Sequence, residues 1–423
     1  MPTTVYTSNS PLAMAEPCTR KSFYAAGRWW LTWAEDAGQI LYSTSTDAIS
    51  WSSAGTIPTG GDNYGYDYGT HYDGSKFSYA RTVGAVVYYR RGTPTAGGTF
   101  TWDAAEQTVR SGLPENGTFA NILTDGSGYP WITYSIGQRY LYVIKSSTNN
   151  GTWTTQSGYP ILLIDGGGSS KWPQATMVWL GGSNIYLNYG YIASTFRGKL
   201  YSGSWQSEEV LPGGASFSGI MSATAERPSA NVYFVAKDNS SKTIYYYYRP
   251  WGGSWTSPNG IKSLSAFVPL GITLISTSDW YVFYGEGNYI KYQRCKNSVW
   301  QSEVTLYNES YAILWENALT ILSASSQFGI MCHWIRNVSG SYQIRVGFLL
   351  LPIVCTGSLA LSGAISFGRI YYGNESLILS GQFSRTTAFI RSFNEIFSLS
   401  PQFANTILIY LFGYSEDEWE IDG

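Results

Sequence analysis

The chain has 423 residues, of which 13% are charged and 17% aromatic, and 46 are glycines. So many aromatic side chains can bury a large core, which excludes an intrinsically disordered polymer. The formal net charge of -2 gives no basic surface for a polyphosphate, and no apolar run approaches the roughly 20 residues that span a bilayer, so we expect neither a nucleic-acid partner nor a membrane-spanning segment.

The N-terminal residues 1–18 carry neither the basic start nor the apolar core of a secretory signal, so whether a signal was removed stays open. Within them, Thr3–Ser8 (TTVYTS) has the composition of a short β-strand. Its partner strand becomes clear from the repeat that follows.

A tryptophan recurs along the chain, with successive gaps of 51, 51, 52, 50 and 45 residues. The series consists of Trp51, Trp102, Trp153, Trp205, Trp255 and Trp300. A repeat of this length is one supersecondary unit. We expect these indoles to pack in the core rather than to stack on a sugar.

Strand-forming segments precede each tryptophan. In one unit YPWITYS is followed by YLYVIKS and then by GTWTTQS, with Gly, Asn, Asp and Ser at the joins. The pattern predicts a four-stranded antiparallel sheet, with strands A to D and the tryptophan opening strand D. Units of about 40 to 50 residues with four short strands are typical of β-propeller blades.

A seventh unit begins near Trp315 but lacks the tryptophan and D strand expected near residue 350. Thr3–Ser8 lies about one repeat before Trp51 and supplies a strand of the missing kind. Closing the ring with strands from both ends protects edges that invite aggregation. We therefore predict an all-β, seven-bladed β-propeller over residues 1–352, with six blades and a separate sheet as the alternative.

Residues 353–423 have a different repeat. The segments SLALSGAIS, SLILSGQFS and IFSLSPQFA align, with Ser362, Ser380 and Ser400 in equivalent positions. About 70 residues of short alternating strands bury too little area to be robust alone. We predict a small β-strand repeat module that serves attachment or self-assembly, with simple packing as the alternative.

The four cysteines are Cys18, Cys295, Cys332 and Cys355, and no Cys-x-x-Cys pair occurs. A zinc knuckle is therefore not expected, and four buried thiols are preferred to two disulfides. The two histidines, His71 and His333, suggest neither a triad nor a metal cluster. We expect no metal and no cofactor.

The stretch STDAISW, with Ser45, Asp47 and Trp51, resembles the Asp-box of the sialidase and BNR-repeat propellers. In that family the serine and aspartate pin the turn between strands C and D, and the tryptophan packs beneath it. The usual glycine of the box is replaced in this chain, and the other units keep chiefly the tryptophan. The resemblance implies a structural role for this turn.

The same resemblance implies a ligand face. In that family the D–A and B–C connections share one face, opposite the Asp-boxes, and ligands bind there. Residues 60–74, GGDNYGYDYGTHYDG, follow strand D of the first unit and precede strand A of the second, so they are expected on this face. The candidate ligand-binding residues are Glu35, Asp36, Asp62, Asp67, His71, Arg81, Asp165, Trp172 and Arg197, with Glu115 and Glu286 beside them. Aromatic rings beside carboxylates suit a carbohydrate.

Catalysis is a weaker expectation. A sialidase needs three clamping arginines, and the family's Phe/Tyr-Arg-Ile-Pro motif is absent from the sequence. A glycoside hydrolase needs only two carboxylates, which Asp62, Asp67 or Asp73 could supply with Glu35 or Asp165. His71 could be a base, but a lone histidine in a tyrosine-rich stretch is more often structural.

Three hypotheses remain. The first is a non-catalytic protein of the extracellular space, the cell surface or the virion surface, whose propeller face binds a glycan or another cell-surface ligand. The second is a glycoside hydrolase or polysaccharide lyase that acts from the same face. The third is a purely structural filament or virion subunit.

Overall fold

The computed structural model describes residues 2–14, 18–35, 39–57, 68–167, 171–226, 229–264, 270–276, 278–311, 313, 321–322 and 330–349. In these residues every regular element is a β-strand, and the strands form seven antiparallel sheets. No helix in them is long and apolar enough to cross a membrane. The module predicted for 353–423 lies outside the described residues.

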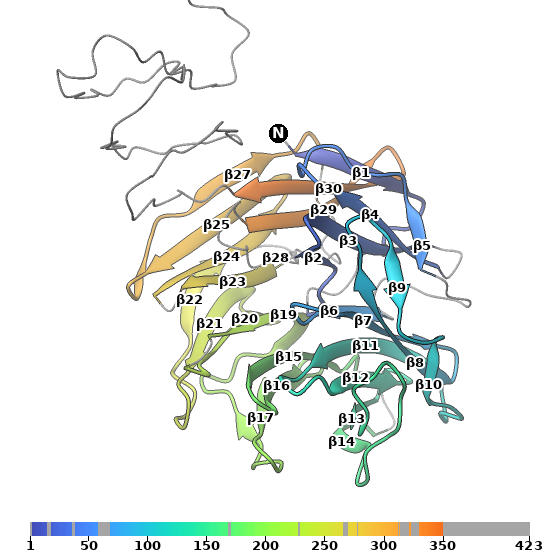
Figure 1. The fold of residues 1–423 in the computed structure, drawn as a ribbon. Helices are drawn as coiled ribbons and strands as arrows, with labels where there is room; N and C mark the ends of the chain where they lie inside the picture. Colours follow the sequence, from blue (N-terminus) through green and yellow to red (C-terminus); the bar gives the residue numbers. More distant parts are fainter. Residues whose placement is uncertain are drawn as a thin grey trace, which may run out of the picture. The chain divides into compact units, whose positions relative to one another are not determined.

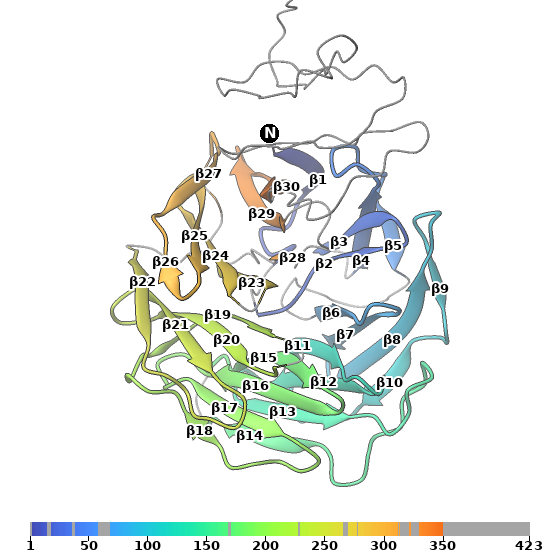
Figure 2. The ribbon, with the colours of Figure 1, turned by 60° about the vertical axis from the view of Figure 1, so that its left-hand side comes forward.

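The seven sheets follow one another around a common axis, which confirms the predicted seven-bladed β-propeller (Figures 1 and 2). Each sheet is one blade, and its strands are called A to D from the innermost to the outermost. Blade 1 contains β2 (Ser22–Ala25), β3 (Arg28–Glu35), β4 (Gln39–Ser45) and β5 (Gly55–Ile57). Blade 2 contains β6 (Tyr68–Tyr72), β7 (Phe77–Val83), β8 (Val86–Pro94) and β10 (Gln107–Arg110), with β9 (Phe100–Trp102) also paired to β8. Blade 3 contains β11 (Gly117–Thr124), β12 (Pro130–Ile136), β13 (Tyr140–Lys145) and β14 (Ile161–Asp165).

The remaining blades repeat this order. Blade 4 contains β15 (Gln174–Gly181), β16 (Asn184–Gly190), β17 (Arg197–Tyr201) and β18 (Glu209–Val210). Blade 5 contains β19 (Phe217–Ala225), β20 (Val232–Asp238), β21 (Thr243–Arg249) and β22 (Asn259–Ser263). Blade 6 contains β23 (Leu270–Ser276), β24 (Asp279–Glu286), β25 (Tyr289–Lys296), β26 (Val299–Trp300) and β27 (Val304–Asn308). Blade 7 contains β28 (Ile321–Leu322), β29 (Ile330–Val338), β30 (Ser341–Leu349) and the N-terminal β1 (Thr3–Ser8).

The second strand of each blade explains the continuous apolar runs in the sequence. In β12 and β20 every residue is buried, because a blade is covered on both faces by its neighbours. Alternation of apolar and polar residues is therefore weak in these strands, since neither face of the sheet meets water.

The recurring indoles pack between blades. Trp255 is 8% exposed, and its Nε1 donates to the Tyr186 hydroxyl of the preceding blade at 2.8 Å. Likewise Trp205 packs edge-on against Trp131 of blade 3, with ring centroids 5.9 Å apart. The expectation that the indole opens strand D is wrong for four of the six: Trp51, Trp153, Trp205 and Trp255 precede β5, β14, β18 and β22. Because these tryptophans lie outside the hydrogen-bonded strands, their rings can extend to the neighbouring sheet.

The N-terminal strand closes the ring, as the sequence predicted. β1 pairs antiparallel with β30, from Thr3 opposite Val346 to Ser8 opposite Tyr342. The Arg345 guanidinium reinforces the joint, because Nη2 donates to the Pro2 carbonyl at 2.9 Å and Nε contacts Glu309 at 3.2 Å. Strands from the two ends of the described chain thus complete one blade.

Residues 18–21, which precede β2, fill the channel between the inner strands. Asn121 Nδ2 donates to the Cys18 carbonyl at 3.0 Å, and Lys21 Nζ donates to the Tyr68 carbonyl at 2.6 Å. Cys18, Thr19 and Lys21 are buried. Burial, together with the nearby Lys21 charge, lowers the pKa of His333 to about 3, so this imidazole is neutral and structural.

The connections define two rims of the propeller. The D–A and B–C connections meet at one rim, where Gly166 N of one donates to the Arg139 carbonyl of another at 3.0 Å. The A–B and C–D connections meet at the opposite rim, where Asn149 Nδ2 of a C–D connection donates to the Ser127 carbonyl of an A–B connection at 2.9 Å. They are called the D–A rim and the A–B rim below.

Deleting residues 1–8 removes the outer strand of blade 7 and leaves β30 as an open edge. Loss of five paired positions at about 1 kcal/mol per hydrogen bond predicts a fall of roughly 5 °C or more in the unfolding midpoint, with aggregation on heating. Differential scanning fluorimetry with light scattering measures both effects. Thr7→Ala, at an exposed position of the same strand, is the control and should stay near wild type.

Trp255→Ala removes a buried indole and the hydrogen bond to Tyr186, so the free energy of unfolding should fall by about 3 to 5 kcal/mol. Trp251→Ala in the same connection removes a side chain that is 45% exposed and should cost under about 1 kcal/mol. Equal denaturation midpoints of the two variants in urea would contradict the inter-blade role of Trp255.

Candidate functional site

A pocket of about 710 Å³ opens at the axis on the A–B rim. Its walls come from strand A of six blades, mostly from its second half, with Arg20 before β2 and residues of the turns that follow strand A. The lining residues are Arg20, Ser22, Phe23, Tyr24, Thr70, His71, Tyr72, Asp73, Gly74, Leu123, Met177, Val178, Trp179, Thr224, Ala225, Glu226, Leu274, Ile275 and Ser276. The segment 18–21 and β2 contribute Arg20 and Ser22, so the pocket is a recess beside residues that fill part of the channel.

The wall has two chemically different arcs. Blades 1 and 2, with the segment before β2, supply the polar and aromatic arc, which includes Arg20, His71 and Tyr72. Blades 3 to 6 supply an arc that is mostly aliphatic, for example Met177 and Ile275. Most groups of both arcs lie on the inner strands, and Arg20, Asp73, Gly74 and Glu226 lie directly beside these strands, so the frame of the pocket is the rigid sheet.

The polar arc is fixed by its own contacts. Thr70 donates to the Arg20 carbonyl through N at 3.2 Å and through Oγ1 at 2.7 Å, which joins the segment before β2 to β6. The Tyr72 ring stacks on Phe23 with centroids 5.1 Å apart, and its hydroxyl donates to the Gly74 carbonyl at 2.8 Å. Burial, and then the charge of Asp73, raise the pKa of Tyr72, so the phenol keeps its proton.

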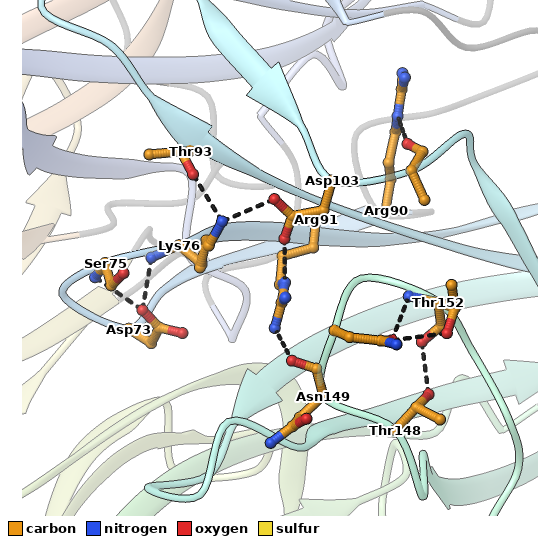
Figure 3. A network of polar contacts seen from close by, with 12 residues as sticks. Asp73, Ser75, Lys76, Arg90, Arg91, Thr93, Asp103, Thr148, Asn149 and Thr152 are labelled. Carbon is orange, nitrogen blue, oxygen red and sulfur yellow. Dashed lines mark hydrogen bonds and ion pairs between the residues drawn. The ribbon is translucent and has the colours of Figure 1, made fainter.

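A network of ion pairs within blade 2 supports the β6–β7 turn (Figure 3). Asp73 Oδ1 accepts from Ser75 N at 2.8 Å and from Lys76 N at 2.7 Å. Lys76 Nζ reaches Asp103 at 2.7 Å, and Arg91 Nε contacts the other oxygen of Asp103 at 2.7 Å. The turn that carries Asp73 and Gly74 into the pocket is thereby tied to strand C and to the C–D connection of its own blade.

In the aliphatic arc, Trp179 is the largest ring. Its Nε1 donates to the Gly182 carbonyl at 2.8 Å. The indole also packs on Gly126 of blade 3, where a Cβ would come within 2.4 Å of the ring. A glycine is needed at position 126 because two A–B turns meet there with the indole between them.

The D–A rim holds several of the predicted ligand-binding residues. Asp165 ends β14 and is exposed, and Trp172 is 37% exposed, with its backbone N donating to the Gln138 carbonyl at 3.0 Å. Glu35 ends β3 at this rim, and Arg197 begins β17 and pairs with Glu208 at 3.0 Å. These groups are spread over blades 1, 3 and 4.

Arg81 and His71 do not join them. Arg81 is 2% exposed and forms a bidentate pair with Glu106, at 2.8 and 2.7 Å, so its guanidinium is occupied in the core of blade 2. The expectation that residues 60–74 all precede strand A is wrong, because Tyr68–Tyr72 is strand A itself. His71 therefore lies near the A–B rim and lines the axial pocket. Asp36, Asp62 and Asp67 lie outside the described residues.

The turn that resembles an Asp-box lies between strands C and D of blade 1. Asp47 Oδ1 accepts from Ser45 Oγ at 2.9 Å, Ile49 N at 2.8 Å and Ser50 N at 2.7 Å. Partial burial disfavours the charge, but these hydrogen bonds outweigh it and lower the pKa of Asp47 to about 2. Trp51 is half-buried against the core that blades 1 and 7 share.

Sequence reasoning missed most of the pocket. Arg20, Tyr24, Trp179 and Glu226 lie in inner strands or directly beside them, and the repeat was recognised from the tryptophan and the two strand candidates before it, not from strand A. The sequences GSG and GGSN, which precede the aromatic B strands of blades 3 and 4, mark where strand A ends, and they were the available signal.

Comparison with known proteins shows similarity of fold and none of sequence family. No protein-family model matches the chain, and no curated protein matches it in sequence. Among solved structures, a polysaccharide lyase, an ulvan lyase bound to GlcA(1-4)Rha3S, is similar with a TM-score of 0.57 and 10% identity over 81% of this chain and 94% of that chain. The Aleuria aurantia lectin in complex with Fucα1-6GlcNAc has a TM-score of 0.43 and 14% identity over 67% of this chain and 94% of that chain. At 10% identity the similarity to the lyase supports the propeller fold alone.

Asp103→Ala should loosen the pocket turn, because Arg91, which is 8% exposed, and Lys76 lose their counter-charge. We expect a loss of about 2 kcal/mol or more in stability, with faster hydrogen exchange at the Asp73 amide, which otherwise donates to the Lys76 carbonyl.

The pH dependence gives a second readout. Burial opposes ionisation, but the bonds from Lys76 and Arg91 prevail and lower the pKa of Asp103, so its contribution is present above about pH 4 and lost as pH falls. The variant should lack that part of the acid dependence. Asp165→Ala, at an exposed carboxylate, is the control, and an unchanged Asp73 exchange rate in Asp103→Ala would contradict the supporting role.

Proposed function

We propose that this propeller binds a carbohydrate in the axial pocket of the A–B rim. The single observation that carries the proposal is the composition of the pocket, in which aromatic rings (Tyr24, Tyr72, Trp179) stand beside hydrogen-bonding groups (His71, Asp73) on the inner strands and the turn after β6. Sugars present C–H faces that stack on rings and hydroxyls that bond to polar side chains. A volume of about 710 Å³ lies within the usual range for small-ligand sites.

The fold agrees with this function. The ulvan lyase that shares the propeller arrangement holds a saccharide in its solved structure. As in the interpretation of the sequence, we propose a non-catalytic role at the cell surface, in the extracellular space or on a virion. Residues 353–423 would then provide attachment or self-assembly. Other cell-surface ligands and a purely structural role are the alternatives to glycan binding.

A second candidate is a polysaccharide lyase, and the polar arc favours it. Arg20, His71 and Tyr72 lie on adjoining segments of one wall. A β-elimination needs a cation to neutralise a uronate carboxylate, a base to remove the proton on the carbon next to it, and an acid to protonate the departing glycosidic oxygen. The C–O bond breaks as a C=C bond forms. A guanidinium, an imidazole and a phenol can fill these roles.

Glycan-array binding decides the location of the site. Wild type should bind a subset of glycans, and Tyr72→Ala and Trp179→Ala should each weaken binding about tenfold, which is the loss of roughly 1.4 kcal/mol of ring contact. Trp172→Ala, on the D–A rim, should bind like wild type. Loss in Trp172→Ala alone would place the ligand on the D–A rim instead, and no binding by wild type would overturn the proposal. Thermal midpoints confirm that each variant is folded.

The same proteins separate a binder from a lyase. Polyuronates are incubated with wild type and with His71→Ala, and the ultraviolet absorbance of an unsaturated uronate product is followed over time. A non-catalytic protein gives no increase with either. An increase that His71→Ala abolishes would establish the lyase, and release of reducing ends without that absorbance would indicate a hydrolase.

A further inference from the structure

Glu226 stands apart from the other wall residues of the pocket. It follows β19 directly, at the A–B turn of blade 5, and its side chain is 6% exposed. Among the lining residues from blades 3 to 6 it is the only one with a charged side chain. A carboxylate in an otherwise mostly aliphatic arc is costly unless each oxygen has a donor.

The two oxygens of Glu226 are in different situations. Oε2 accepts from Asn231 Nδ2 at 2.7 Å, from the Tyr233 hydroxyl at 3.3 Å and from Ser229 Oγ. Oε1 is buried and has no hydrogen-bond partner in the described part of the chain. The backbone fixes the turn as well, because Glu226 N donates to the Asn231 carbonyl at 2.9 Å and Ala230 N donates to the Glu226 carbonyl at 2.9 Å. The carboxylate is therefore held through one oxygen only.

Three glutamates at a different place in the fold, directly before the outer strand of blades 2, 4 and 6, give a comparison. They also accept a tyrosine hydroxyl from strand B, but each has a cation that satisfies the second oxygen. The pairs are Glu106 with Arg81, Glu208 with Arg197, and Glu303 with Lys291. None of these three lines the pocket. Glu226 differs from these three in both respects. It has no ion pair among the described residues, and it lines the pocket.

We propose that Glu226 Oε1 is a specificity-determining acceptor for a hydroxyl of the bound sugar. This proposal rests on carbohydrate binding in the axial pocket. The terminal χ3 torsion of a glutamate has a broad energy minimum. A small rotation about it, with the hydrogen bonds to Oε2 kept, brings Oε1 to the pocket surface. The desolvation cost of burying Oε1 is already part of the free energy of the folded protein. A hydroxyl of the ligand that donates to Oε1 therefore stabilises the complex without a second desolvation of this oxygen.

The position of Glu226 also orients the ligand. An anionic substituent is repelled at blade 5 and is accommodated only toward Arg20 and His71, on the opposite arc. The site therefore takes a sugar edge with a free hydroxyl at blade 5, between aliphatic contacts from Met177 and Ile275. A sulfate or carboxylate at that same edge is excluded.

Glu226→Gln is the test, measured by titration calorimetry with a glycan that the array identifies. The amide keeps an oxygen for Ser229, Asn231 and Tyr233 but presents an NH₂ group where Oε1 stood. We expect affinity to fall about ten- to a hundredfold, with the thermal midpoint unchanged or raised. Glu208→Gln, which alters a tyrosine-bonded glutamate away from the pocket, is the matched control and should bind like wild type.

Monodeoxy versions of the glycan identify the hydroxyl. One deoxy sugar should bind wild type at least about tenfold more weakly yet bind Glu226→Gln no worse than the parent sugar does. The derivative sulfated at that hydroxyl should bind wild type more weakly still. If Glu226→Gln does not fold, Glu226→Asp, which withdraws the carboxylate by one methylene, should show the same loss.

The outcomes separate the two proposals. Unchanged affinity in Glu226→Gln, with affinity lost in Tyr72→Ala, would overturn the role of Glu226 and leave the pocket as the binding site. A loss of affinity accompanied by a lower thermal midpoint of the same size as in Trp255→Ala would show a structural role and overturn the acceptor role. Failure of wild type to bind any glycan removes the proposed function itself.

Discussion

The pairing of β1 with β30 is the contact on which the rest of the molecule depends. Each blade is apolar on both faces, because its neighbours cover it, so an incomplete ring would expose the faces of two blades to water. The indoles add to this constraint by reaching from one blade to the next, as Trp255 does to Tyr186. Closure turns a series of marginal sheets into one cooperative structure.

Ring closure also creates the site. Seven inner strands around an axis leave a central channel, and residues 18–21 fill part of it through contacts with Asn121 and Tyr68. What remains is a recess on the A–B rim whose groups come from six blades. No single blade could form such a site, because each contributes only the end of one strand. The ion network of Asp103 then holds the turn beside it in place.

The pocket and the ligand-binding face implied by the resemblance to sialidase-type propellers lie on opposite rims. The difference matters because a propeller offers two rims, and the fold alone does not say which one is used. Glu35, Asp165, Trp172 and Arg197 are spread over blades 1, 3 and 4 at the D–A rim, whereas the axial recess gathers rings, an imidazole and carboxylates around one volume. Convergence of groups favours the recess, and the unsatisfied oxygen of Glu226 adds a chemical preference within it.

The sequence by itself determined the blade period, the number of blades and the closing role of Thr3–Ser8, because these follow from regular spacing and from the count of strands. It also indicated that Asp47 stabilises a turn, since that contact is local in the chain. Only the tertiary structure decided that Arg81 is occupied by Glu106, that His71 lies in strand A, and that Arg20 and Glu226 line one pocket. Those relations join residues up to 206 positions apart, and the arrangement of the inner strands around the axis, which no local pattern encodes, brings them together.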